Sequence, residues 1–256
     1  MALSEREIER YSRQLVLPEW SGAVQERLSK ASAVVVGAGA LGSPAATYLA
    51  AAGVGRLGIV DGDWVEISNL QRQFLHYTPD IEAQKAESAA QKLGVLNTEI
   101  TVEPYPVEID ADNAEALVMG ADVVVDCTDS FDTRYVINDA CCAQRVALVE
   151  GGALGFGGMV MASRPGETAC YRCAFPTAPP DAPSCRDAGM LGAVAGVIGS
   201  LQALEALKLL SGVGTAPGDV IVQFDGLSLT QTLVRTSRRA DCSACAGVVA
   251  STESSA

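Results

Sequence analysis

Short apolar runs alternate along this chain with longer stretches in which apolar positions recur every three or four residues. The runs are rich in Val, Ile and Leu, which is typical of strands buried on both faces. We expect strands at 33–36, 57–60, 100–102, 122–125 and 147–149. We expect helices at 5–17, 22–30, 43–52, 80–93, 112–118 and 132–144. This alternation predicts an α/β fold with a Rossmann-like, doubly wound and mostly parallel sheet.

The pattern changes after residue 150. Five glycines between 151 and 158 precede the apolar run 159–161, which predicts turns and an antiparallel extension of the sheet. The proline-rich stretch 175–186 is expected to be an irregular loop, followed by a helix over 189–210 and a strand over 220–225. The chain is therefore divided into 1–30 (helical), 31–150 and 151–247 (two halves of one integrated domain) and 248–256 (a small polar tail expected to be disordered).

A glycine-rich loop follows the first predicted strand. Gly37, Gly39 and Gly42 have the spacing of a dinucleotide-binding turn, with a strand before and a helix after. Such a loop brings backbone N–H groups and the positive end of a helix to phosphate oxygens. Asp61 ends the second strand and can accept hydrogen bonds from ribose hydroxyls, or it can cap a turn. An NAD-dependent dehydrogenase would show the same pair, so these two features leave the reaction open.

The polar residues that follow favour ATP over a nicotinamide cofactor. Arg72 suits the β- and γ-phosphates, because a guanidinium binds phosphate oxygens through two parallel hydrogen bonds. Lys85 would add a second positive charge, whereas Arg13 would have to fold back or come from a second subunit. Asp129 follows the fourth buried strand and is a candidate Mg²⁺ ligand, with Asp126 as the alternative.

Composition and cysteine spacing narrow the class of protein further. The net charge of −13 argues against broad binding of nucleic acid or anionic membranes. The polar N-terminus has no signal-peptide pattern, and we expect no membrane span and a cytoplasmic protein. A disulfide framework is not expected there. Instead, two C-x-x-C pairs could supply Cys170, Cys173, Cys242 and Cys245 to one closed structural zinc site, with two unrelated surface pairs as the alternative.

Several stretches together resemble the MoeB/ThiF/HesA family, the bacterial relatives of ubiquitin-activating enzymes. They occur in one order over residues 10–247, at 10–14 (RYSRQ), 37–42 (GAGALG), 51–55 (AAGVG), 68–73 (SNLQRQ), 126–129 (DCTD), 133–135 (TRY), 170–173 (CYRC) and 199–205 (GSLQALE). The resemblance implies a homodimer that uses Mg-ATP to adenylate the C-terminal Gly-Gly carboxylate of a ubiquitin-like sulfur carrier protein of the MoaD or ThiS type. Pyrophosphate would leave, and the acyl-adenylate would be ready for sulfur transfer. Residues 151–247 would then bind the carrier.

The resemblance also implies roles for particular residues. Arg13 (from the second subunit), Asn69, Arg72, Lys85 and Asp129 (through Mg²⁺) would serve catalysis. The ATP contacts would be Gly37, Gly39, Ala40, Gly42, Asp61, Ser68, Asn69, Leu70, Gln71, Arg72, Lys85, Asp129 and Ser130. Two of these depart from the family: Ala40 stands where Gly is common, and Ser130 where Asn is common. Cys185 matches a cysteine that links covalently to the carrier in part of the family and is dispensable in the rest.

Two other classes of function stay open on the sequence alone. One is an NAD-dependent oxidoreductase on the same sheet, which the 68–73 run and the absence of a proton-relay histidine disfavour. His76, the only histidine, is expected to be structural. The other is a scaffold without catalysis, suggested by Ala40 and Ser130. Because the sequence stops near the second cysteine pair, we expect a separate sulfur donor protein. The pathway, whether molybdopterin, thiamine, cysteine or a thio-containing natural product, is not indicated.

Overall fold

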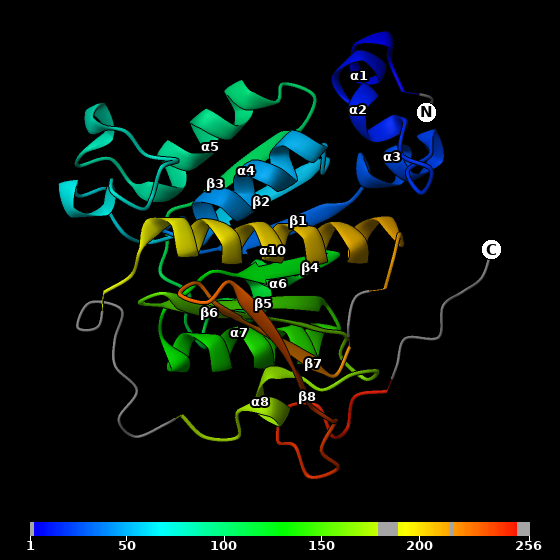
Figure 1. The fold of residues 1–256 in the computed structure, drawn as a ribbon, viewed down its shortest axis with the longest axis vertical. Coiled ribbons are helices and arrows are strands. Elements are labelled where there is room, and N and C mark those ends of the chain that lie inside the picture. Colours follow the sequence, from blue (N-terminus) through cyan, green and yellow to red (C-terminus); the bar gives the residue numbers. More distant parts are fainter. Residues whose placement is uncertain (1–2, 179–188, 216–217, 250–256) are drawn as a thin grey trace.

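A mixed eight-stranded sheet runs through the centre of the protein in the order β3-β2-β1-β4-β5-β6-β7-β8 (Figure 1). The computed structural model describes residues 3–178, 189–215 and 218–249. The strands of this part are β1 (Ser32–Val36), β2 (Arg56–Val60), β3 (Thr101–Tyr105), β4 (Val123–Asp126), β5 (Ala147–Leu154), β6 (Gly157–Ser163), β7 (Val220–Asp225) and β8 (Thr230–Arg235).

The first five strands are parallel and form the predicted doubly wound half. β1 pairs in parallel with both β2 and β4. Strands β2 and β3 are therefore added on one side of β1, and β4 and β5 on the other side, so the strand order reverses between β1 and β4. All four residues of β4 are buried, as expected for a strand covered on both faces. Ligands of such sheets bind at the carboxyl ends of the strands beside this reversal, which therefore locates the candidate site.

Helices cover both faces of the sheet. The helices are α1 (Glu5–Arg10), α2 (Ser12–Leu15), α3 (Gly22–Leu28), α4 (Gly42–Ala52), α5 (Lys85–Leu96), α6 (Ala114–Val118), α7 (Phe131–Gln144), α8 (Tyr171–Ala174) and α10 (Gly192–Ser211), with two short 3₁₀ turns at Ile67–Asn69 and Thr78–Asp80. One apolar core lies under α4, α5 and α10, and a second lies under α6 and α7 on the opposite face. The fold class predicted from the sequence is confirmed.

The antiparallel extension differs in detail from the prediction. The glycines at 151 and 152 lie inside β5 and not in a turn, and they are there because large side chains cross the strand at this point. A Cβ on Gly151 would lie 2.2 Å from the Gln202 side chain, and one on Gly152 would lie 3.2 Å from the Arg134 guanidinium. β8 was not predicted, because all six of its residues are exposed and it therefore lacks the apolar alternation that marks a strand.

The N-terminal helix is broken where the sequence suggests one helix over 5–17. The break falls at Tyr11, whose ring is buried and lies under Gly53 at the end of α4. Its hydroxyl accepts a hydrogen bond of 2.9 Å from Asn97. This tertiary contact overrides the local helical pattern. It fastens α1 and α2 at the end of the sheet opposite to the carboxyl ends of the parallel strands (Figure 1).

α10 corrects the expectation that no apolar segment is long enough to cross a bilayer. An 18-residue window of this 20-residue helix has a mean hydropathy of 1.5, so by length and composition alone the helix could span a membrane. In this fold α10 packs against α3, α4 and strands β4 to β6, and its buried side includes Ile198 and Ala206. Burial in the core therefore accounts for its apolar composition.

Candidate nucleotide-binding site and cysteine cluster

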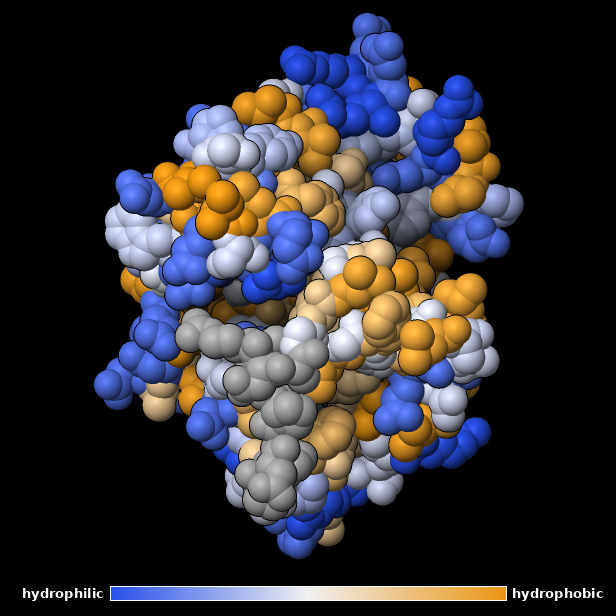
Figure 2. All heavy atoms as spheres, turned by 60° about the vertical axis from the view of Figure 1, so that its left-hand side comes forward, coloured by the Kyte–Doolittle hydropathy of each residue, from blue (hydrophilic) through white to orange (hydrophobic). Residues whose placement is uncertain are grey.

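A cavity of about 420 Å³ opens at the carboxyl ends of β1, β2 and β4. Figure 2 turns this end of the molecule toward the reader and shows a hollow bordered by polar and apolar side chains. Eight of the residues predicted from the sequence line it: Gly37, Gly39, Ala40, Asp61, Arg72, Lys85, Asp129 and Ser130. The structure thus brings together residues from five separate segments of the chain.

The glycine loop lies between β1 and α4 with the geometry that its spacing predicts. Gly37 has φ +93°, and a Cβ there would lie 3.0 Å from the carbonyl oxygen of Cys127. A Cβ on Gly42 would lie 1.8 Å from the carbonyl oxygen of Gly37, so Gly42 lets α4 start close behind the loop and does not itself face the cavity. Gly39 and Ala40 line the cavity at the positive end of α4, where phosphate oxygens are stabilised.

The Asp61 carboxylate is bound to the glycine loop. Its Oδ2 accepts the N–H of Ala38 at 2.7 Å, and its Oδ1 accepts the N–H of Asp63 at 2.9 Å. Burial raises the pKa of Asp61 above its ordinary value, and the positive charge of Lys85 opposes that shift. Asp61 therefore caps a turn and also lines the cavity, and its contact with a ribose stays a prediction.

Two cations also line the cavity. The Lys85 side chain is only 7% exposed, and its Nζ lies 2.8 Å from Oδ2 of Asp63, which is 77% exposed. Lys85 is also the first residue of α5. Arg72 donates from Nη1 to the carbonyl oxygen of Ser68 at 2.9 Å, and it too lines the cavity. A wall with two cations, one of them buried, suits a polyanion.

The turn after β4 contributes the remaining polar groups. Asp129 and Ser130 are exposed and line the cavity, and the Ser130 Oγ also accepts the Thr133 N–H at 3.1 Å as the N-cap of α7. Asp126 is fully buried, and its Oδ1 accepts the Thr128 N–H at 2.8 Å. Asp126 thus holds the turn, and Asp129 is the carboxylate available to a ligand.

Several predicted contacts do not reach the cavity wall. Ser68, Leu70 and Gln71 are absent from its lining, as is Asn69, which is buried and accepts the Glu66 N–H at 3.0 Å. The run 68–71 instead shapes the turn that carries Arg72. Cys185 lies outside the described residues.

Arg13 is also absent from the cavity of its own chain. Gln14, the next residue of α2, donates to the carbonyl oxygen of Ala52 at 3.2 Å, at the carboxyl end of α4. The cavity lies at the other end of α4, which is 11 residues or about 16 Å away. Arg13 can therefore serve this kind of site only in another subunit.

Several polar lining residues had no role in the prediction, among them Asp63, Gln73, Glu108, Thr128, Thr133 and Arg134. Gln73 follows Arg72, and its buried Oε1 has no hydrogen-bond partner among the described residues. Arg134 belongs to 133–135, one of the stretches that resemble the family, but no function was predicted for it from the sequence. His76 is structural as expected: its ring nitrogens lie 2.9 Å from Ser88 Oγ and 2.9 Å from the Ala38 carbonyl oxygen.

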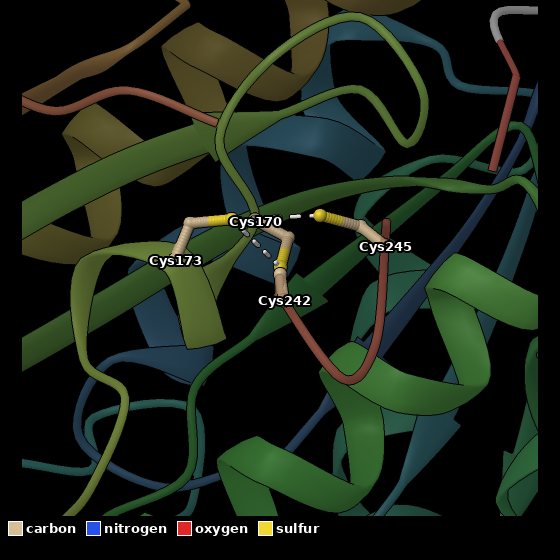
Figure 3. Close-up of side chains that lie close together, drawn as sticks. All are labelled: Cys170, Cys173, Cys242 and Cys245. Carbon is tan, nitrogen blue, oxygen red and sulfur yellow. Dashed lines mark hydrogen bonds between the residues drawn. The ribbon is translucent and has the colours of Figure 1, made fainter. Parts of the chain in front are cut away.

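The four predicted zinc ligands form one compact cluster (Figure 3). Cys170 and Cys173 come from the start of α8, and Cys242 and Cys245 come from one loop near the end of the described chain. All four Sγ atoms lie within 4.8 Å of one another, and all four residues are buried.

The spacing of these sulfurs fits a tetrahedral metal. Sγ–Sγ distances are 3.8 Å for Cys170–Cys173, 3.6 Å for Cys170–Cys242 and 3.4 Å for Cys173–Cys245. Thiolates at about 2.3 Å from Zn²⁺ would be about 3.8 Å apart. The Arg239 N–H also donates to Cys173 Sγ at 3.3 Å, which favours a thiolate. Four sulfurs with no open position can hold a structural metal.

The model of the ThiF family matches residues 11–244. The chain belongs to the ThiF family. The match covers the glycine loop, the cavity and all but the last of the clustered cysteines, so the resemblance read from the motifs is confirmed.

Named relatives are similar over most of this chain. An adenylyltransferase and sulfurtransferase MOCS3 from Sus scrofa is 48% identical over 247 residues, which are 95% of this chain and 54% of that protein. The chain therefore spans about half the length of this relative. A sulfur carrier protein adenylyltransferase from Thermus thermophilus is 43% identical over 252 residues, covering 96% of this chain and 93% of the relative.

The fold is also that of a solved structure. The crystal structure of Escherichia coli MccB with ATP has a TM-score of 0.83 with 23% identity, covering 92% of this chain and 74% of the other. This similarity concerns the fold alone.

Proposed function

We propose that this chain is an adenylyltransferase that activates the C-terminal Gly-Gly carboxylate of a ubiquitin-like sulfur carrier protein with ATP. The observation that carries the proposal is the cavity, in which a glycine loop at a helix N-terminus faces Arg72, Lys85 and Asp129. A phosphate-binding turn and two cations in one cavity suit a nucleoside triphosphate better than a dinucleotide. The relative from Thermus thermophilus, similar over nearly its whole length, bears the name of this activity.

The reaction joins two anions, the carrier carboxylate and the ATP phosphates, and the charged side chains of the cavity would reduce the repulsion between them. A carboxylate oxygen of the carrier forms a bond to the α-phosphorus, the bond from that phosphorus to the β-phosphate breaks, and pyrophosphate takes the electron pair. Arg72 and Lys85 would stabilise the charge that gathers on the leaving pyrophosphate. Asp61 would orient the ribose. Asp129 would hold Mg²⁺, which screens phosphate charge when bound. A carboxylate that is already ionised needs no general base, which agrees with the structural role of His76.

A structural zinc ion is the second part of the proposal. The four buried sulfurs have the number, chemistry and spacing that Zn²⁺ requires. The metal would join α8 to the loop that holds Cys242 and Cys245, 68 residues beyond the first pair. Its role would be to stabilise the second half of the chain, with no part in the chemistry.

A homodimer is the third part. Arg13 is exposed and cannot reach the cavity of its own chain. Large apolar side chains are exposed on the neighbouring helices α4 and α10: Tyr48 at 55%, Val197 at 38% and Leu204 at 51%. Val197 and Leu204 are seven residues apart and share one face of α10. A second subunit packed on this surface would cover them and would supply Arg13 to the site.

Assay of ATP–pyrophosphate exchange tests the proposal. Exchange is expected with Mg²⁺ and a carrier that ends in Gly-Gly, and not with the same carrier shortened by its last glycine. Binding of NADH without any exchange across several such carriers would instead favour an oxidoreductase. The cytoplasm is the proposed location, and a separate protein is the proposed sulfur donor.

A further inference from the structure

Three ionisable side chains lie buried behind the turn that carries Asp129. Asp126 ends β4, Glu150 lies in β5, and Arg134 lies in the first turns of α7, with exposed fractions of 0%, 1% and 9%. Asp126 and Glu150 are paired residues of adjacent parallel strands, so their side chains lie next to each other on one face of the sheet. That face is the one covered by α7, since Val124 and Leu148, two positions earlier in each strand, pack in the core under this helix.

The charges of this cluster do not balance if both carboxyl groups are ionised. One guanidinium faces two carboxyl groups, and Oδ2 of Asp126 and both oxygens of Glu150 have no hydrogen-bond partner in the described chain. A buried, unpaired carboxylate is far more costly than a buried carboxylic acid. Burial raises the pKa of Asp126 and of Glu150, and the negative charge of Asp126 raises the pKa of Glu150 further. One proton on Glu150 leaves one negative charge, on Asp126, near the one positive charge of Arg134.

The cluster also fixes the backbone that leads to Asp129. The Thr128 N–H donates to Asp126 Oδ1 at 2.8 Å, and Arg134 Nη2 donates to the Thr128 carbonyl oxygen at 2.9 Å. From the other face of the sheet, Gln202 Nε2 donates to the Asp126 carbonyl oxygen at 2.6 Å. The residue just before Asp129 is therefore held on both sides. Gly152 leaves room for the guanidinium, because a Cβ there would lie 3.2 Å from Nη1 and Nη2.

We infer that Asp126, Arg134 and a neutral Glu150 form a buried positioning cluster that orients Asp129 toward the metal–nucleotide complex. This inference rests on the proposed function. These three residues act through Asp129, and none of them is assigned a contact with the metal. The cluster would explain why a costly set of buried charges lies at the cavity, with Arg134 in its lining and the two carboxyl groups behind it.

Isothermal titration of the full chain with ATP tests the inference, once with Mg²⁺ and once with EDTA. Glu150→Gln keeps the size and neutrality of the protonated acid, so its affinity for Mg-ATP should stay within about twofold of wild type. Asp126→Asn removes the negative charge that attracts Arg134, so its affinity for Mg-ATP should fall about tenfold while metal-free ATP binding stays unchanged. Gly152→Ala, which pushes on the guanidinium, is the second variant if Asp126→Asn does not fold, and it should show the same split.

A double mutant separates positioning from simple destabilisation. Asp126→Asn combined with Asp129→Asn should bind Mg-ATP no more weakly than Asp129→Asn alone, because both changes act on one contact. Three outcomes would each overturn the inference while leaving the proposed function intact. The losses of Mg-ATP affinity could be additive in the double mutant, Asp126→Asn could lose metal-free ATP binding equally, or Glu150→Gln could bind Mg-ATP as weakly as Asp126→Asn. A wild-type chain that binds no ATP under either condition would overturn both.

Discussion

The carboxylate of Asp61 accepts the backbone N–H of Ala38 at 2.7 Å and so joins the end of β2 to the glycine loop after β1. The residue predicted to accept a ribose also fixes the loop predicted to bind phosphate. Because its other oxygen takes the N–H of Asp63, the ribose site and the phosphate site are parts of one hydrogen-bonded unit. A change at Asp61 should therefore affect both.

Asp61→Asn should weaken ATP binding by about tenfold. The amide oxygen can still accept one N–H, but its NH₂ group then faces a second N–H donor and cannot accept from it, and a charge-assisted hydrogen bond contributes about 1.5–3 kcal/mol. The Kd for Mg-ATP from titration calorimetry measures the effect. Asp112→Asn, an exposed change away from the cavity, is the control and should bind as wild type does. Unchanged binding by Asp61→Asn would remove Asp61 from the site.

Arg72→Ala should reduce ATP–pyrophosphate exchange by at least about a hundredfold, because it removes charge stabilisation from the leaving pyrophosphate. Arg72→Lys should recover only part of the rate, since an ammonium group cannot form two parallel bonds to phosphate. The matched control is Arg164→Ala, whose side chain is 45% exposed and is not part of the cavity wall. If Arg72→Ala exchanges at the wild-type rate, the phosphate site lies elsewhere.

The sequence predicted the parts of this site that depend on local order along the chain. The glycine loop and Asp61 follow apolar runs directly, Asp129 comes a few residues after one, and the carboxyl ends of parallel strands meet at one edge. Glu150 also follows an apolar run, but that it lies near Arg134 could not be found in this way. They meet because β4 pairs with β5 and because α7 returns over that pair, and neither relation is visible in a linear pattern.

Other differences have equally specific causes. Asn69 and Gln71 belong to the same 68–73 motif, yet only Arg72 and Gln73 of that motif line the cavity, and Asn69 bonds instead to the backbone of Glu66. The position of Arg13 depends on the contact of Tyr11 with Gly53, which no sequence rule anticipates. The cysteine pairs were the opposite case, since C-x-x-C spacing and zinc chemistry together define one site.

The purified chain should contain about one zinc ion per molecule, and Cys242→Ser should lose it. Loss of the metal should also lower the Tm by about 5 °C or more, because binding stabilises the native state alone. Metal analysis by mass spectrometry and a thermal melt give both values. Cys142→Ala is the control, since Cys142 packs against the same cysteines but is not one of the four. Metal-free protein with an unchanged melt would contradict the prediction.

Glu150→Gln should raise the Tm by a few degrees at pH 8, with the difference shrinking as the pH falls toward 4.5. Burial raises the pKa of Glu150 well above its ordinary value of 4.5, so the native state binds more protons than the unfolded state above that pH. Stability of the wild type therefore falls as pH rises through this range, whereas glutamine has no proton to lose.

The groups that face Glu150 are the same in both proteins: Asp126 on β4, Cys127 after it, Arg134 and Cys141 on α7, and Tyr171 on α8. Melts of the two proteins from pH 4.5 to 8 therefore isolate the titration of Glu150. A Tm difference that is constant across this range, or that grows toward acid, would show that Glu150 is ionised in the native state.

Intact-mass spectrometry of a carrier protein incubated with this chain, ATP and Mg²⁺ would detect the proposed adenylation itself. A carrier ending in Gly-Gly should gain the mass of one AMP unit. The gain should disappear when the last glycine is deleted, and it should be lost with Arg72→Ala. The proposed adenylation would be contradicted if every carrier in a panel of such proteins kept its original mass after incubation with wild-type protein that is folded and binds Mg-ATP.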